Sequence, residues 1–207
     1  MIEIIATDIG KKFGTEWIIK NFNHHFTSDK PCVILGGNGS GKSTLLKIIS
    51  AYMQAGKGKL EYLIHQKKIE PASVYKHISY AAPYLELIEE FTCIENIQFQ
   101  QKFKPFLNQY TSNDILDLSG LSHSAKKQIK VFSSGMKQRL KLTLAILADC
   151  PFLFLDEPCS NLDAKAIDWY QQMLDEYAAK KLIIICSNHL HYEYQICKEQ
   201  INTEEFK

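Results

Sequence analysis

A buried strand, a glycine-rich loop and a helix follow one another near the start of the chain. The strand is the apolar run Cys32-Val33-Ile34-Leu35, and the helix begins at Ser43 with apolar residues at helical spacing. Between them lies the motif G-x-x-x-x-G-K-S, formed by Gly36, Gly37, Asn38, Gly39, Ser40, Gly41, Lys42 and Ser43. In this context the motif predicts a phosphate-binding loop at the carboxyl edge of a parallel sheet.

The residue types of this loop suit a nucleotide that carries Mg²⁺. Glycines let the backbone fold tightly around phosphates, and the amide groups before Thr44 point at the anion. Lys42 can reach the β- and γ-phosphates, and the Ser43 hydroxyl can ligate Mg²⁺. The alternative is a glycine turn with a chance lysine, which leaves the flanking strand and helix unexplained.

A second apolar strand ends in two carboxylates, in the run Phe152-Leu153-Phe154-Leu155-Asp156-Glu157. Ligands bind where parallel strands end, so Asp156 suits the Mg²⁺ shell. Glu157 lies one position further and can polarise a water as a general base. An acidic pair after a strand is more often a turn or a helix start, but the phosphate loop upstream favours the catalytic interpretation.

The remaining pattern alternates strands and helices, which predicts a parallel sheet covered by helices. Further strands are expected at Ile2 to Ile5, Trp17 to Ile19, Lys59 to Ile64, Ile78 to Ala81 and Leu182 to Cys186. Helices are expected from Tyr84 to about Lys130 with two connections (Asn108 to Asn113, Ser119 to Ser124), at Met136 to Ala148 and at Ala164 to Tyr177.

Composition excludes several classes of protein. With 207 residues, 45% of them hydrophobic and 23% charged, the chain can bury a core without disulfides or structural metals. No apolar run reaches the roughly 18 residues of a membrane span. The formal net charge of +1 is too small to attract the negatively charged backbone of a nucleic acid, so we expect no nucleic-acid partner.

Cysteine usage and the N-terminus favour the cytoplasm. The six cysteines are scattered without C-x-x-C pairs, which is typical of reduced structural cysteines. Residues Met1 to Asp8 include early acids and no basic segment followed by a long apolar stretch, so we expect no signal peptide.

Three further segments, in the right order, make the chain resemble the nucleotide-binding subunit of the ATP-binding cassette (ABC) family. Phe132-Ser133-Ser134-Gly135-Met136 resembles the signature L-S-G-G-Q, and Ser160-Asn161-Leu162-Asp163 resembles the D-loop. Cys186-Ser187-Asn188-His189 ends the last apolar strand where the family carries its switch histidine. Taken singly, the first two segments could be ordinary helix caps and His189 could be structural.

The resemblance implies a fold, namely a phosphate-loop NTPase with a RecA-like parallel sheet core flanked by helices, an antiparallel β subdomain and an inserted helical subdomain. It implies one ABC ATPase domain over residues 1–207. The RecA-like and β parts would cover about 1–82 and 136–207, and the helical subdomain about 84–135.

The resemblance also implies an ATPase that uses ATP and Mg²⁺ in a head-to-tail dimer, with itself or with a related subunit. Ser133 and Gly135 of one subunit would contact the γ-phosphate held by the other, and Asp163 would act across that dimer. His189 would contact the γ-phosphate within its own subunit. Phe13 would stack on adenine; the alternatives are a core phenylalanine or stacking by Trp17.

The partner implied is an integral membrane permease on a separate chain, which would hold this subunit at the inner face of the cell membrane. The permease would dock near Tyr84, Leu85, Leu87 and Ile88. A soluble cassette ATPase, for example in metal-cluster assembly, and a small-molecule kinase are the alternatives. The signature segment and the switch histidine disfavour a kinase.

The chain departs from the family pattern at three positions. Pro83 occupies the place of a glutamine that touches Mg²⁺ and the attacking water, and proline has no side-chain oxygen. Either water replaces the glutamine as a ligand of Mg²⁺, or the alignment with the family is off by a few residues and Glu86 approaches the metal instead. Ser134 for glycine and Met136 for glutamine alter the signature, and Ser134 adds a Cβ where a backbone must approach closely.

Overall fold

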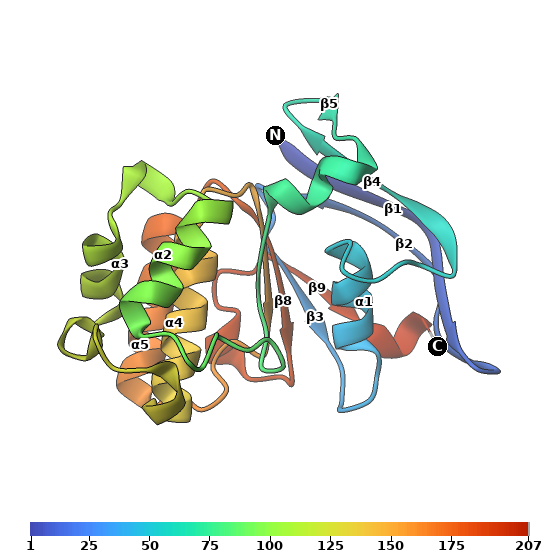
Figure 1. Cartoon of the computed structure of the whole chain (residues 1–207). Helices are drawn as coiled ribbons and strands as arrows, with labels where there is room; N and C mark the ends of the chain where they lie inside the picture. Colours follow the sequence, from blue (N-terminus) through green and yellow to red (C-terminus); the bar gives the residue numbers. More distant parts are fainter. Residues whose placement is uncertain (207) are drawn as a thin grey trace.

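Two sheets form the frame of the molecule in the computed structural model, which describes residues 1–206 (Figure 1). An antiparallel sheet has the order β2-β1-β4-β5, and a parallel sheet has the order β6-β7-β8-β3-β9. The antiparallel strands are β1 (Ile2–Phe13), β2 (Glu16–Thr27), β4 (Lys57–Ile64) and β5 (Lys67–Lys68). The parallel strands are β3 (Cys32–Leu35), β6 (Ile78–Ala81), β7 (Phe152–Asp156), β8 (Leu182–Ser187) and β9 (Glu199–Asn202).

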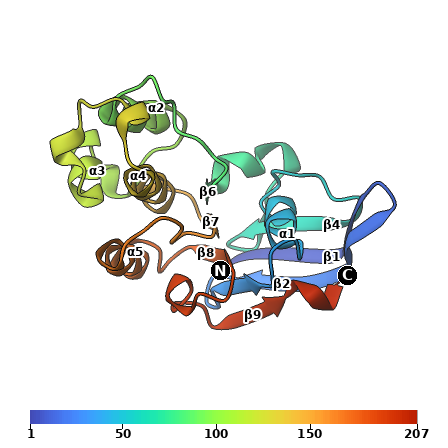
Figure 2. The same ribbon diagram turned by 90° about the horizontal axis from the view of Figure 1, so that it is seen from below.

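The helices divide between the two sides of the parallel sheet. They are α1 (Lys42–Ile49), α2 (Cys93–Phe103), α3 (Ser112–Ser119), α4 (Ser134–Leu147) and α5 (Ala164–Tyr177). Helix α1 lies between the two sheets, whereas α2 to α5 gather on the far side of the parallel sheet (Figures 1 and 2). This arrangement confirms the predicted fold class of a parallel sheet with helices and an antiparallel sheet.

Strand β3 joins two hydrophobic cores because its side chains alternate between the faces of the sheet. Val33 and Leu35 pack in the core formed with α2 to α5. Cys32 and Ile34 pack in the core that includes α1 and the antiparallel sheet. Burying a side chain of this size stabilises the fold by about 1.5–3 kcal/mol, so the strand that leads into the phosphate loop is held from both faces.

The antiparallel strands β1 and β2 are longer than the sequence predicted. Asp8 and Asn21 adopt left-handed backbone conformations, with φ of 51° and 50°, and the pairing register shifts after Ala6. These bulges break the alternation of apolar and polar residues, so only the regular ends were recognisable. Strand β9 was also missed, because it has four residues and mixed polarity and exists through its pairing with β3.

The expectation of a helical pattern from Tyr84 to Lys130 is wrong for its first part. Residues 84–91 contain no helix, and α2 begins after Thr92, whose side chain forms a capping box with Glu95. Helix α3 begins in the same way after Thr111. Helix α4 starts at Ser134, two residues before the predicted start, because Ser133 caps it. No helix among residues 1–206 is long and apolar enough to cross a bilayer.

Candidate functional site

The phosphate loop connects β3 to α1 and depends on two glycines for its shape. Gly36 has a φ of 151°, and a Cβ there would lie 2.4 Å from the hydroxyl oxygens of Ser40 and Thr203. Gly41 has a φ of 100°, and a Cβ there would lie 2.9 Å from Ile18. The Thr203 hydroxyl also donates to the Leu35 carbonyl at 3.1 Å. The loop is therefore held by Thr203, the residue directly after β9, which the sequence did not single out.

A pocket opens above this loop and contains most of the predicted nucleotide contacts. Its lining comprises Phe13, Ile18, Asn38, Gly39, Ser40, Gly41, Lys42, Ser43, Thr44 and Glu157. Phe13 is 50% exposed and so does not belong to the core. Gly36 and Gly37 lie at the base of the loop, outside the lining, and the Gly37 carbonyl accepts a hydrogen bond from Lys42 Nζ at 3.0 Å.

Asn188 joins the loop lysine to the acidic strand end, and sequence reasoning did not assign it a role. Lys42 Nζ donates to Asn188 Oδ1 at 2.6 Å. The Asn188 side-chain amide donates to Glu157 Oε1 at 2.7 Å. Glu157 itself has a left-handed backbone with a φ of 45°, and its amide donates to the Cys186 carbonyl. The ends of β7 and β8 thus hold the carboxylate facing the loop.

Asp156 ends β7 as a buried carboxylate without a partner. It is 2% exposed, and neither of its oxygens has a hydrogen-bond partner among the described residues. Burial raises the pKa of Asp156, and the nearby Glu157 raises it further, while the Ser43 hydroxyl and Lys42 act in the opposite direction. An orphaned carboxylate beside a hydroxyl provides the hard oxygen ligands that Mg²⁺ requires, so the residues present fit this cation.

The signature turn and the D-loop lie in a second pocket, apart from the phosphate loop. Ser133 caps α4 by accepting from the Met136 amide at 3.2 Å, and Asp163 caps α5 by accepting from the Ala166 amide at 2.8 Å. Ser133, Gly135 and Asp163 line this pocket, which shares no lining residue with the pocket above the loop. One chain therefore does not bring these residues to its own phosphate loop.

His189 is exposed and has a left-handed backbone with a φ of 63°. It does not line the pocket above the phosphate loop. The neighbouring strand end is fixed instead by Glu193, which is buried and accepts hydrogen bonds from the Ser187 hydroxyl and the Cys159 amide. Burial raises the pKa of Glu193, although both hydrogen bonds lower it.

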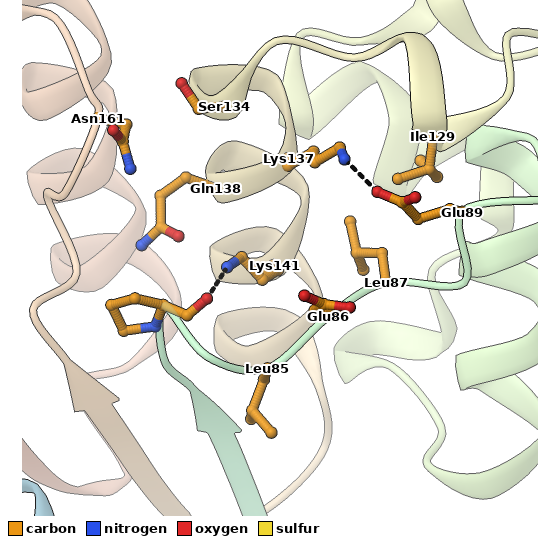
Figure 3. A pocket seen from close by; sticks show the side chains of 11 residues that line it. Leu85, Glu86, Leu87, Glu89, Ile129, Ser134, Lys137, Gln138, Lys141 and Asn161 are labelled. Atoms are coloured by element: carbon orange, nitrogen blue, oxygen red, sulfur yellow. Dashed lines mark hydrogen bonds and ion pairs between the residues drawn. The ribbon is translucent and has the colours of Figure 1, made fainter.

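At the position of the expected glutamine, Pro83 is exposed, and its carbonyl accepts from Lys141 Nζ at 3.2 Å. Glu86 lines a groove beside α4 and not the pocket above the phosphate loop (Figure 3). Tyr84 turns toward the site: its hydroxyl bonds to that of Tyr80, and Lys47 Nζ lies 3.9 Å from its ring centroid. The pKa values of both tyrosines are raised, mainly by burial and also by the charge of Asp156.

A phosphate loop, an acidic strand end and a separate signature turn define the ATP-binding cassette class. The family model for ABC transporters matches residues 19–160, and the chain belongs to this family. It is 28% identical over 92% of its length to the uncharacterized ABC transporter ATP-binding protein YcbN of Bacillus subtilis, of which it spans 62%. It is 29% identical over 76% of its length to the cytochrome c biogenesis ATP-binding export protein CcmA of Xylella fastidiosa, of which it spans 70%.

The fold is that of solved cassettes. The dimeric structure of the bacterial ABC transporter cassette MJ0796 superimposes with a TM-score of 0.79 at 21% identity, over 97% of this chain and 95% of that one. A bacterial Atm1-family ABC exporter with ATP bound gives a TM-score of 0.80 at 15% identity, over 98% of this chain and 38% of that one.

Proposed function

We propose that the chain is the ATP-binding and ATP-hydrolysing subunit of an ABC transporter, working with a separate membrane permease. The observation that carries the proposal is the hydrogen-bonded path from Lys42 through Asn188 to Glu157. This path connects the group that would hold the γ-phosphate to the carboxylate that would activate water. The buried, unpartnered Asp156 beside it supports a site for ATP with Mg²⁺.

The loop residues Gly36 to Thr44 bind the phosphates through backbone amides, and Lys42 provides the charge. Phe13, half exposed at the rim of the same pocket, offers its ring to adenine. Ser43 and Asp156 would hold Mg²⁺, which supplies charge neutralisation on the phosphates when bound. Pro83, at the place where the family has a glutamine, has no side-chain oxygen, so water would have to take that place in the metal shell.

Glu157 acts as the general base in this proposal. Its carboxylate takes a proton from a water that attacks the γ-phosphorus in line, and the bond to the leaving ADP oxygen breaks. Asn188 holds the carboxylate through Oε1, leaving Oε2 for the water. When ATP draws Lys42 to the γ-phosphate, Asn188 loses its bond to the lysine and keeps its bond to the base. His189, exposed next to Asn188, is proposed to contact the γ-phosphate after closure.

The two separate pockets support a head-to-tail dimer, formed with a second copy or a related subunit. Ser133 and Gly135 are exposed or half-buried at the start of α4, away from their own phosphate loop. A partner's signature turn can therefore cover the γ-phosphate, and Asp163 lies beside that turn. Ser134 is exposed in the same turn, so its hydroxymethyl group faces the partner.

A groove beside α4 supports docking of the permease, which would place the protein at the cytoplasmic face of the membrane. The groove has a volume of about 200 Å³ and lies between α4 and the segment that follows Pro83 (Figure 3). Leu85 and Leu87 provide apolar contacts, while Lys137 pairs with Glu89 at 2.5 Å on its wall. An apolar groove with a charged rim suits an amphipathic helix.

Turnover and oligomeric state of the full-length chain test the ATPase proposal. We expect the wild type to hydrolyse ATP and Glu157→Gln to bind ATP without turnover and to form a dimer detectable by light scattering. Glu90→Gln, a change at an exposed glutamate, serves as the control. Full turnover by Glu157→Gln would refute the assigned base.

Capture from detergent-solubilised membranes tests the transport partner. The ATP-loaded Glu157→Gln protein is expected to retain a polytopic membrane protein, and the double variant with Leu85→Glu in the groove is expected to lose it. Leu85→Glu alone, in the otherwise wild-type chain, is expected to leave basal ATP hydrolysis unchanged. Retention of soluble proteins alone would favour a soluble cassette ATPase instead.

A further inference from the structure

Three metal-ligating side chains of different chemistry meet where the two sheets face each other, away from the phosphate loop. His24 comes from β2, Cys32 from β3 and Glu199 from β9. Their ligand atoms, an imidazole nitrogen, a thiol sulfur and a carboxylate oxygen, all lie within 4.8 Å of one another. The proposed function uses none of these residues.

Strand pairing fixes two of the three ligands side by side. Cys32 and Glu199 are direct partners on the neighbouring parallel strands β3 and β9. Ile34 and Ile201, two residues further along each strand, pack in the core that faces the antiparallel sheet. Because side chains alternate along a strand, Cys32 and Glu199 share this face.

The third ligand comes from the strand that covers this face. Phe22 and Phe26 of β2 are buried in the same core, and His24 lies between them with its ring centroid 4.3 Å from that of Phe26. Side chains two positions apart on a strand face the same way, so the His24 imidazole points into this core as well. The three strands therefore bring the ligands together through regular structure, without any loop.

The imidazole nitrogen is left without a hydrogen bond. His24 Nε2 is buried and has no hydrogen-bond partner within residues 1–206, although Glu199 Oε2 lies 3.3 Å away. The Cys32 thiol is fully buried, and its sulfur makes only a weak 3.7 Å contact with the carbonyl of the next residue. A buried, unbonded nitrogen costs free energy unless another group occupies its lone pair.

We propose that His24, Cys32 and Glu199 form a binding site for a zinc-class divalent cation. Nitrogen, thiolate and carboxylate donors are the ligands that Zn²⁺ takes in proteins. Bonds of about 2.0–2.3 Å in a tetrahedron place ligand atoms about 3.5 Å apart. The nitrogen and the carboxylate oxygen already have this spacing at 3.3 Å, and small side-chain rotations bring in the sulfur.

Two of the three side chains are partly exposed, and the lysine next to Glu199 is directed elsewhere. The side chains of His24 and Glu199 are 19% and 33% exposed, so water can reach the site and complete the tetrahedron. The amine of the adjacent Lys198 is directed to the Asp29 carbonyl at 3.3 Å. A bound cation would fasten β2 to the parallel sheet and stabilise the folded chain by mass action.

Cobalt substitution tests the site independently of ATP hydrolysis. The full-length, nucleotide-free chain is stripped with a chelator and titrated with Co²⁺ in excess Mg²⁺, which competes for the carboxylates at the end of β7. We expect one equivalent to bind with a thiolate-to-cobalt charge-transfer band. Cys32→Ser abolishes that band, whereas Cys93→Ser, a change at an equally buried cysteine in α2, keeps it.

Zinc affinity, measured by competition with a chromophoric chelator, provides the second readout. Loss of an outer-shell partner alone costs roughly 10- to 100-fold in metal affinity, so His24→Gln is expected to weaken binding by more than about 100-fold. His25→Gln, at the exposed neighbour on the same strand, leaves the affinity unchanged. The comparison of His24→Gln with His25→Gln still tests the metal site if Cys32→Ser fails to fold.

Equal Zn²⁺ affinity of the wild type and His24→Gln, a charge-transfer band that survives Cys32→Ser, or the lack of stoichiometric binding would each overturn the proposal. The contact between His24 and Glu199 would then be an ion pair between the sheets. ATP hydrolysis by the same preparations separates this result from a failure of the proposed ATPase function.

Discussion

The side-chain amide of Asn188 donates a hydrogen bond to Glu157 Oε1 at 2.7 Å, and this bond crosses from the end of β8 to the end of β7. The same asparagine accepts a bond from Lys42 Nζ. The two strand ends and the phosphate loop are thus coupled through one neutral side chain. A change at Asn188 should therefore affect the positioning of the base more than the binding of the nucleotide.

We predict that Asn188→Ala lowers the kcat of ATP hydrolysis by at least about tenfold, a part of the roughly 10²- to 10⁴-fold that a general base contributes. The KM for ATP is expected to change little, because the backbone amides of the loop still bind the phosphates. Steady-state kinetics check this, with Asn113→Ala at an exposed asparagine of α3 as the control. An increase in KM at unchanged kcat would contradict the assigned role.

The second prediction concerns Asp156, whose buried carboxylate has no hydrogen-bond partner in the part of the chain that the structure describes. In the absence of Mg²⁺, Asp156→Asn is expected to increase the free energy of unfolding by about 1 kcal/mol, because it removes a buried, unpaired charge. The variant should lose Mg²⁺-dependent ATP binding. Urea unfolding in a chelator and nucleotide titration measure the two effects, and a destabilised variant would argue against an orphaned carboxylate.

The third prediction is a pH dependence at Glu193. Burial raises its pKa in the folded state, so its contribution to stability is present at low pH and is lost as the pH rises through the folded-state pKa. Glu193→Gln lacks this titration. Its stability relative to the wild type is therefore expected to increase as the pH is raised.

Denaturant unfolding at a series of pH values measures this difference. Glu193→Ala is the comparison, since it leaves the Ser187 hydroxyl and the Cys159 amide without their acceptor and should cost about 1–3 kcal/mol. A stability difference between Glu193→Gln and the wild type that does not vary with pH would show that the carboxylate does not titrate in this range.

The fourth prediction concerns Phe13, which is half exposed at the rim of the phosphate-loop pocket. Stacking on a base is worth about 1–3 kcal/mol, so Phe13→Ala is expected to raise the Kd for ATP by roughly 5- to 150-fold. The melting temperature should hardly change because the ring is not in the core. Phe13→Trp should restore binding, and unaltered affinity in Phe13→Ala would exclude the stacking role.

The strand, loop and helix around Lys42 were predictable because all the determinants lie within a few residues of one another. An apolar strand, glycines that tolerate a φ of 100° or 151° and a following amphipathic helix are local properties. The acidic end of β7 was predictable for the same reason. The capping residues Ser133 and Asp163 also carried a local signal, since serine and aspartate are preferred at helix starts.

Contacts between distant strands were not predictable in this way. Asn188 reaches Lys42 across 146 positions of sequence, and Thr203 reaches Ser40 across 163. Neither contact leaves a pattern in the chain, because it depends on the order of β8, β3 and β9 in the sheet. The side chain of Tyr84, the residue after Pro83, packs against Lys47, and this contact also depends on tertiary packing.

The sequence by itself determined the class of protein and the residues that would hold phosphate and activate water, because that chemistry requires particular side chains at short spacing. Only the tertiary structure decided which side chains support them and where the signature turn lies relative to the loop. It also brought His24, Cys32 and Glu199 together. The physical reason is that sheet pairing joins residues by strand order and register, which no local stretch of sequence contains.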